Sequence, residues 1–179
     1  MGGESMYNKT MPSIKLEKIK SDKDIKNIDC GVHSIQEMMK DAYYMTICKQ
    51  AFAYNIIVND KIVGNCLVRF RSFQDEEYYS NDMEYCALDI SYLAIDKKDQ
   101  GKSYGSFALA ALIKDALSLS NLCPIRCLTL QALPGLDTLY QKYGFQKCPA
   151  ENDPRFPDST PMIFDFIDPH EIEQYGDQF

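Results

Sequence analysis

An apolar segment that runs through a glycine-containing turn into an amphipathic helix most limits the folds open to this chain. Residues 83–96 (MEYCALDISYLAID) have the length and composition of a long strand. Residues 97–103 (KKDQGKS) form a polar turn, and apolar residues then recur at helical spacing from Tyr104 onward. Such a unit leaves the first amides of the helix unpaired, where the helix dipole adds partial positive charge. The sequence therefore predicts an anion site at this turn.

The remaining segments predict strands and helices around this unit. The paired residues Asn59-Asp60 favour a tight hairpin between two β-rich runs. Hairpin strands followed by a strand, helix, strand crossover predict one mixed sheet with helices on both faces. In chain order we expect an edge strand at 13–19, a short helix at 21–29 capped by Ser21, a helix at 30–48, the hairpin at 51–70, a loop at 71–82, a helix ending near Ser120, a strand at 124–133, a short helix closed by Gly144, and two strands at 145–148 and 161–167.

Length and composition fit one soluble domain. The chain has 179 residues, of which 45% are hydrophobic and 25% charged, and no apolar run approaches the length of about 18 residues that a membrane span needs. We expect a single domain over 1–179, with flexible ends at 1–12 and 169–179. Seven cysteines without a CxxC pair predict reduced thiols and a cytoplasmic location. Two histidines offer almost no material for a zinc cluster or a histidine-based triad, so we expect no metal.

The charge balance constrains the partner. A formal net charge of −7 argues against a broad nucleic-acid surface, because phosphate contacts need clustered lysines and arginines. An acidic face would instead attract a cationic substrate. The stretch QDEEYY at 74–79 has two interpretations, as one wall for such a substrate or as a solvated loop.

The turn itself differs from two common phosphate-binding motifs. Its spacing is not that of a Walker A loop, and it does not follow the first strand of a parallel unit, as a dinucleotide-binding GxGxxG does. Residues 100–105 (QGKSYG) instead resemble the Q/R-x-x-G-x-G/A acetyl-CoA signature of the GCN5-related N-acetyltransferases, the GNAT superfamily. The preceding ISYLAID resembles the fourth strand of that family, and LYQKYGF at 139–145 resembles its Y-x-x-x-G-F element. Together these pieces extend the resemblance over residues 50–148.

This resemblance implies an α/β (α+β) fold with a mixed, mostly antiparallel twisted sheet of about six or seven strands and about four helices on both faces. It also implies acetyl-CoA as acyl donor, with no metal. The pantetheine would run along Leu93, Ala94 and Ile95, with the amide of Leu93 polarising the thioester carbonyl. The residues implied to hold the pyrophosphate are Gln100, Gly101, Lys102, Ser103, Tyr104, Gly105 and Ser106.

The departure from the signature is Ser103, which stands at its first glycine. Serine is a favoured helix N-cap, and its hydroxyl can accept from a free amide or donate to a phosphate. We expect binding to survive, with Lys102 adding a mobile positive charge and Gly105 allowing close approach of the cofactor.

Acetyl transfer to an amine needs a neutral amine, donors for the developing oxyanion and a proton for the departing thiolate. Tyr140 matches the tyrosine that acts as general acid in the family. Asp89 interrupts an apolar strand, where a carboxylate is costly unless paired or used, and is the candidate base; Glu84 is the second candidate. Two other interpretations of Asp89 stay open, a structural hydrogen-bonded residue and a ligand for the substrate ammonium.

The sequence therefore predicts an N-acetyltransferase that acts on a primary amine of a small molecule, peptide or protein, as a monomer or homodimer. The Cys30-Gly31 dipeptide and the general layout also resemble the GNAT toxins that acetylate aminoacyl-tRNA, which keeps tRNA as an alternative partner. A second alternative is a non-catalytic acyl-CoA-binding protein, favoured by Ser103.

Overall fold

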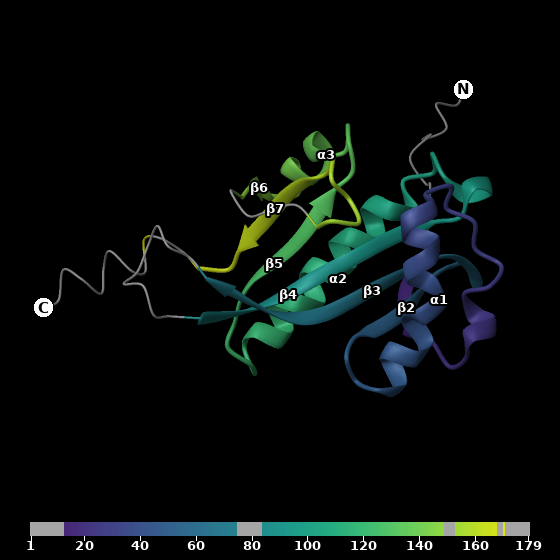
Figure 1. Cartoon of the computed structure of the whole chain (residues 1–179), viewed down its shortest axis with the longest axis horizontal. Helices are drawn as coiled ribbons and strands as arrows, with labels where there is room; N and C mark the ends of the chain where they lie inside the picture. The colour runs from purple at the N-terminus through teal and green to yellow at the C-terminus, as the bar shows by residue number, and fades with distance from the viewer. Residues whose placement is uncertain (1–12, 75–83, 149–152, 168–169, 171–179) are drawn as a thin grey trace, which may run out of the picture.

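A computed structural model describes residues 13–74, 84–148, 153–167 and 170. It contains one sheet of seven strands in the order β1-β2-β3-β4-β5-β7-β6 (Figure 1). Only the β4–β5 pair is parallel, and the other neighbours are antiparallel. The strands are β1 (Ile14–Lys18), β2 (Phe52–Val58), β3 (Lys61–Gln74), β4 (Glu84–Ile95), β5 (Ile125–Ala132), β6 (Gln146–Lys147) and β7 (Thr160–Asp165). The predicted fold class is confirmed.

Helices cover both faces of this sheet. Helix α1 (His33–Ile47) packs its buried residues against one face, and helix α2 (Tyr104–Ser120) packs against the other (Figure 1). The short helix α3 (Asp137–Gln141) follows β5, and two 3-10 turns lie at η1 (Asp22–Asp24) and η2 (Lys97–Asp99). None of the helices in the described ranges is long and apolar enough to cross a membrane.

Two irregularities at β4 position the site. The register between β3 and β4 shifts at Leu67/Val68, so that Ser91 is an extra residue on β4. The parallel pairing of β4 with β5 ends at Ile90 and Leu130, although β4 continues to Ile95. Residues 91–95 therefore pair only with β3, and β4 separates from β5 over these last five residues.

Most predicted elements are present, with two differences. The hairpin at Asn59-Asp60 is confirmed, and both residues have the positive φ values, 48° and 62°, that such a turn requires. The helix predicted at 21–29 is only the η1 turn, because nine residues rich in Asp and Asn are too short and too weakly helical to propagate a helix. The predicted loop at 71–82 is wrong for 71–74, which belong to β3; the rest of it, including most of QDEEYY, lies outside the described residues. The predicted flexible ends lie almost wholly outside them as well.

Candidate functional site

The turn before α2 exposes backbone amides. Ser103 is the N-cap residue of α2 and has left-handed backbone angles, φ 63° and ψ 11°. The first amide bonded within the helix is that of Phe107, which donates to the carbonyl oxygen of Ser103. The amides of Tyr104, Gly105 and Ser106 therefore have no helical acceptor, as the anion-site prediction requires.

Ser103 contributes through its backbone, and the predicted capping by its hydroxyl is wrong. The side chain makes no cap hydrogen bond, since capping needs an extended N-cap backbone and the left-handed conformation directs the oxygen elsewhere. Serine occupies the conformation that the signature glycine would normally supply, at a cost of about 1 kcal/mol. Gly101 is also left-handed, with φ 75°.

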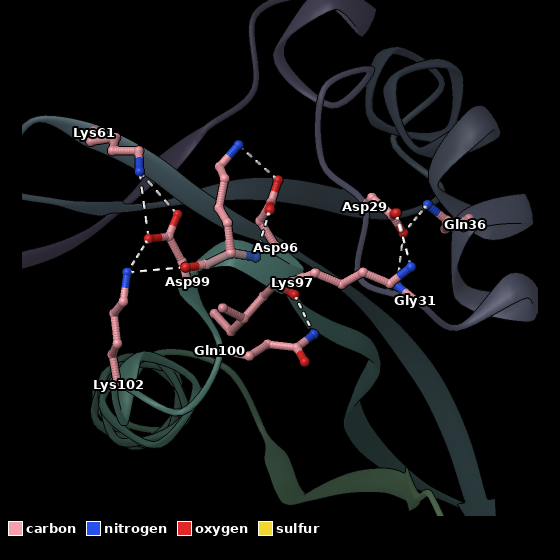
Figure 2. A network of polar contacts seen from close by, with 11 residues as sticks. Asp29, Gly31, Gln36, Lys61, Asp96, Lys97, Asp99, Gln100 and Lys102 are labelled. Carbon is pink, nitrogen blue, oxygen red and sulfur yellow. Dashed lines mark hydrogen bonds and ion pairs between the residues drawn. The ribbon is translucent and has the colours of Figure 1, made fainter.

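Lys102 is not a mobile charge but is held beside the turn. Its Nζ donates to Asp99 Oδ1 at 2.7 Å and to the carbonyl oxygen of Lys98 at 3.1 Å. Lys61, the first residue of β3, reaches Asp99 Oδ2 at 3.1 Å from the other side (Figure 2). The hydrogen bond from Lys102, helped by that from Lys61, lowers the pKa of Asp99. Two ammonium groups are thus fixed at the start of α2 by one carboxylate.

A second set of contacts fastens this turn to the segment before α1. Lys97 Nζ lies 3.0 Å from Asp29 Oδ2, and the amide of Lys97 donates to the carbonyl oxygen of Asp29 at 2.8 Å. The other carboxylate oxygen of Asp29 accepts from the amide of Gly31 at 2.9 Å and from Gln36 at 3.1 Å (Figure 2). Gly31 has φ 81°, and a β-carbon there would lie 2.6 Å from Lys97 Cε. The segment that contains the Cys30-Gly31 dipeptide thus packs against the predicted phosphate-binding turn and holds it in place.

The edge of β4 that faces the separation carries free backbone groups. The amide of Asp96 donates to the carbonyl oxygen of Val63 on β3 at 2.9 Å. Because backbone direction alternates along a strand, Ala94 also faces β3, and Leu93 and Ile95 face the side that β5 has left. The carbonyl oxygen of Ile95 accepts from the Gln100 side chain at 2.9 Å. The amide of Leu93 is therefore directed into the separation, where the predicted oxyanion donor is needed.

Tyr140 lies on the α2 side of the sheet. It packs against the cluster that contains Leu109 and Leu112 of α2, and its ring meets Phe145 edge-on with centroids 5.9 Å apart. Burial raises the pKa of the Tyr140 phenol, which keeps it protonated at neutral pH. Its hydroxyl has no hydrogen-bond partner within the part of the chain that the structure describes. Tyr143 packs against the same cluster, so packing alone does not distinguish the two tyrosines.

Asp89 lies on the opposite face. Its neighbours Leu88 and Ile90 belong to the α2-side cluster, so alternation directs Asp89 toward the α1 side. The residue is only 4% exposed, and its oxygens accept three hydrogen bonds, from Arg69 Nε at 3.2 Å, Ser91 Oγ at 2.8 Å and Thr129 Oγ1 at 3.0 Å. The buried carboxylate is therefore paired. Glu84 begins β4 opposite Gln74, and its side chain lies outside the described part.

Sequence reasoning missed the long-range partners of the buried acids Asp89 and Asp99. Lys61 lies 38 residues before Asp99, and Arg69 lies 20 residues before Asp89. One local signal was present: Arg69 and Arg71 alternate with the apolar residues Val68 and Phe70, which places both arginines on one face of β3. For the described residues, no group of three or more His, Cys, Asp or Glu is arranged to hold a metal. All seven cysteines have free thiols.

The seven-stranded sheet, the separation of β4 from β5 and the helix that starts at a glycine turn define the GNAT fold, as the resemblance predicts. No family model matches the sequence, and no curated protein matches it significantly. Among solved structures, the chain is similar to AtaTR bound with acetyl-CoA, with a TM-score of 0.70 and 20% identity over 90% of this chain and 97% of that one.

Two further structures are similar over nearly their whole length. AtaT complexed with acetyl-methionyl-tRNAfMet has a TM-score of 0.69 and 20% identity, over 92% of this chain and 99% of that one. The KacTA–DNA complex has a TM-score of 0.66 and 20% identity, over 93% of this chain and 100% of that one. The chain thus shares its fold with AtaTR, AtaT and KacTA.

Proposed function

We propose that this protein is an acetyl-CoA-dependent N-acetyltransferase of the cytoplasm. The observation that carries the proposal is the separation of β4 from β5 after Ile90 and Leu130, which opens beside the free amides of α2. The pyrophosphate fits the amides of Tyr104, Gly105 and Ser106, since a helix start of this kind binds anions. Support for the donor also comes from the similar AtaTR structure, which is bound with acetyl-CoA.

In the proposed reaction, the general acid acts from one face of the sheet and the acceptor amine approaches from the other. Acetyl-CoA, when bound, supplies an activated thioester. In the proposal, the amide of Leu93 donates to the thioester carbonyl oxygen and stabilises the charge that develops there. The amine approaches from the face of Asp89, and its nitrogen bonds to the carbonyl carbon while the C–S bond breaks. The Tyr140 hydroxyl, protonated because burial raises its pKa, gives its proton to the departing sulfur.

Asp89 is proposed to orient the acceptor amine. Its side chain is held in place by three hydrogen bonds, from Arg69, Ser91 and Thr129, so that the carboxylate has a fixed position beside the separation of β4 and β5. The amine proton lost in the reaction then passes to solvent, and solvent returns a proton to Tyr140. In this proposal Asp89 is a ligand for the substrate amine and not the catalytic base.

The proposal is tested by thiol release from acetyl-CoA with a panel of amines. We expect Tyr140→Phe to lower kcat by about 100-fold while acetyl-CoA affinity is retained, because general-acid catalysis contributes about 100-fold or more. Tyr143→Phe is the matched control, since it removes a hydroxyl from the same cluster and should leave the rate unchanged. Tight acetyl-CoA binding without turnover on any amine would favour the non-catalytic alternative.

A second candidate function is acetylation of aminoacyl-tRNA. One of the similar structures is AtaT complexed with acetyl-methionyl-tRNAfMet, and another is a tyrosine-to-phenylalanine mutant of AtaT bound to its antitoxin. The net charge of −7 opposes this candidate. Incubation with charged tRNA at several salt concentrations discriminates the two, because phosphate-dependent binding weakens steeply as salt rises.

A further inference from the structure

A pocket lies on the sheet directly beside the point where β4 and β5 separate. Its volume is about 200 Å³, and its lining includes Asp89 and Thr129, the strand pair that precedes the last bonded pair of β4 and β5. Arg71 from β3 and Gln131 from β5 complete its polar side. The pocket therefore adjoins the place where the proposed function puts the acceptor amine.

Arginine side chains gather around this pocket although the whole chain is acidic. Arg69 and Arg71 both lie near Asp89, at 3.2 Å and 3.8 Å. Arg155 pairs with Asp153, whose hydrogen bond raises the pKa of the Arg155 guanidinium, and the negative charge of Asp89 adds a smaller contribution in the same direction. Among the described residues, three guanidinium groups thus lie around two carboxylates, and of these side chains Arg71 and Asp89 line the pocket itself.

Of the three arginines, Arg71 is the one that lines the pocket. Its side chain is 47% exposed, and Nη1 lies 3.8 Å from the nearest carboxylate oxygen of the described residues, Oδ1 of Asp89, which is too far for a hydrogen bond. Asp89 already accepts three hydrogen bonds from other side chains and is nearly saturated. A guanidinium presents a fork of N–H donors that matches the two oxygens of a carboxylate. The pocket can therefore bind a ligand carboxylate through Arg71.

We propose that the acceptor is a small primary amine that also carries a carboxylate, and that Arg71 binds this carboxylate. The inference rests on the proposed function and specifies its substrate class. Arg71 pairs in register with Ala87, four residues before Ser91, where the separation begins. The Arg71 guanidinium itself reaches to 3.8 Å from Asp89, two residues before Ser91, which at about 3.3 Å per residue leaves a span of about 7 Å. Such a span fits the terminal amine of a diamino acid better than an α-amine next to its own carboxylate.

The test uses acceptor pairs that differ only in the carboxylate. L-lysine is compared with 1,5-diaminopentane, and L-ornithine with 1,4-diaminobutane, by thiol release and mass spectrometry of the acetylated product. We expect the wild-type kcat/KM to be at least about tenfold higher for the amino acids, since a charged hydrogen-bonded contact is worth at least that factor. Arg71→Gln should raise KM for lysine about tenfold and leave 1,5-diaminopentane unchanged, and Arg71→Lys should retain part of the preference.

Lys40→Gln is the control, because it removes one positive charge from the exposed surface of α1 and should keep the preference. Circular dichroism confirms that each variant is folded. Equal rates within each pair, or acetylation of aminoacyl-tRNA without any small amino acid, would overturn the carboxylate inference while the acetyltransferase proposal stands. Absence of acetyl transfer to every acceptor, tRNA included, would overturn the proposed function itself.

Discussion

The side-chain amide of Gln100 donates to the carbonyl oxygen of Ile95 at 2.9 Å and to that of Cys30 at 3.0 Å. One residue of the predicted signature thus holds the end of β4 against the segment that leads into α1. The contact leaves the free backbone edge of β4 and the free amides of α2 in a fixed relative position. Gln100 is therefore a positioning residue whose effect on the cofactor is indirect.

Replacing Gln100 with Leu should weaken acetyl-CoA binding about tenfold, because two hydrogen bonds of about 1 kcal/mol each no longer hold the turn. Isothermal titration calorimetry measures the affinity. Gln50→Leu, at an exposed glutamine after α1, is the matched substitution and should leave the affinity unchanged. An unaltered affinity in Gln100→Leu would show that the turn keeps its shape without this side chain.

Ser103→Gly should stabilise the fold by about 1 kcal/mol, because glycine occupies left-handed angles without the steric cost that serine carries. Chemical denaturation measures this change. Ser103→Ala should leave the affinity for acetyl-CoA nearly unchanged, since the hydroxyl makes no capping bond. A marked loss of affinity in Ser103→Ala would instead identify the hydroxyl as a cofactor ligand.

Features that depend on residues close together in the sequence were predicted, whereas contacts between residues far apart in the sequence were not. The strand, turn and helix over 84–120 follow from local periodicity and turn composition, and all three are present. The partners of Asp89 and Asp99 could not be predicted, because they are brought together by the register of β3 against β4. The backbone of Ser103 was also beyond local rules, because capping propensity favours an extended serine, whereas the tertiary turn imposes a left-handed one.

Gly105→Ala should raise the stability of the fold and lower its affinity for acetyl-CoA. A β-carbon at Gly105 would meet Ile95 Cγ1 at 3.5 Å and Leu93 Cδ2 at 3.6 Å, which are ordinary contacts. Alanine is the better helix former, so the free energy of unfolding should rise by about 0.5 kcal/mol. The added methyl group would also stand between the helix start and the cofactor proposed there, so acetyl-CoA affinity should fall. Denaturation measures the expected rise in the free energy of unfolding, and calorimetry measures the expected fall in acetyl-CoA affinity. An unchanged affinity would place the cofactor elsewhere.

The protein should lose stability steeply between pH 9 and pH 12. Burial raises the pKa of the Cys66 thiol from 9.0 to about 12, and that of Cys127 likewise. Above pH 9 the unfolded chain releases these protons while the folded chain keeps them, so the free energy of unfolding falls as pH rises, by about 1.4 kcal/mol per pH unit for each thiol. Urea denaturation at stepwise pH measures this slope. Cys66→Ala should reduce the slope even though it lowers stability at pH 7, whereas Cys123→Ala, at an exposed thiol, should leave it unchanged. An equal slope in Cys66→Ala would rule out this thiol as its origin.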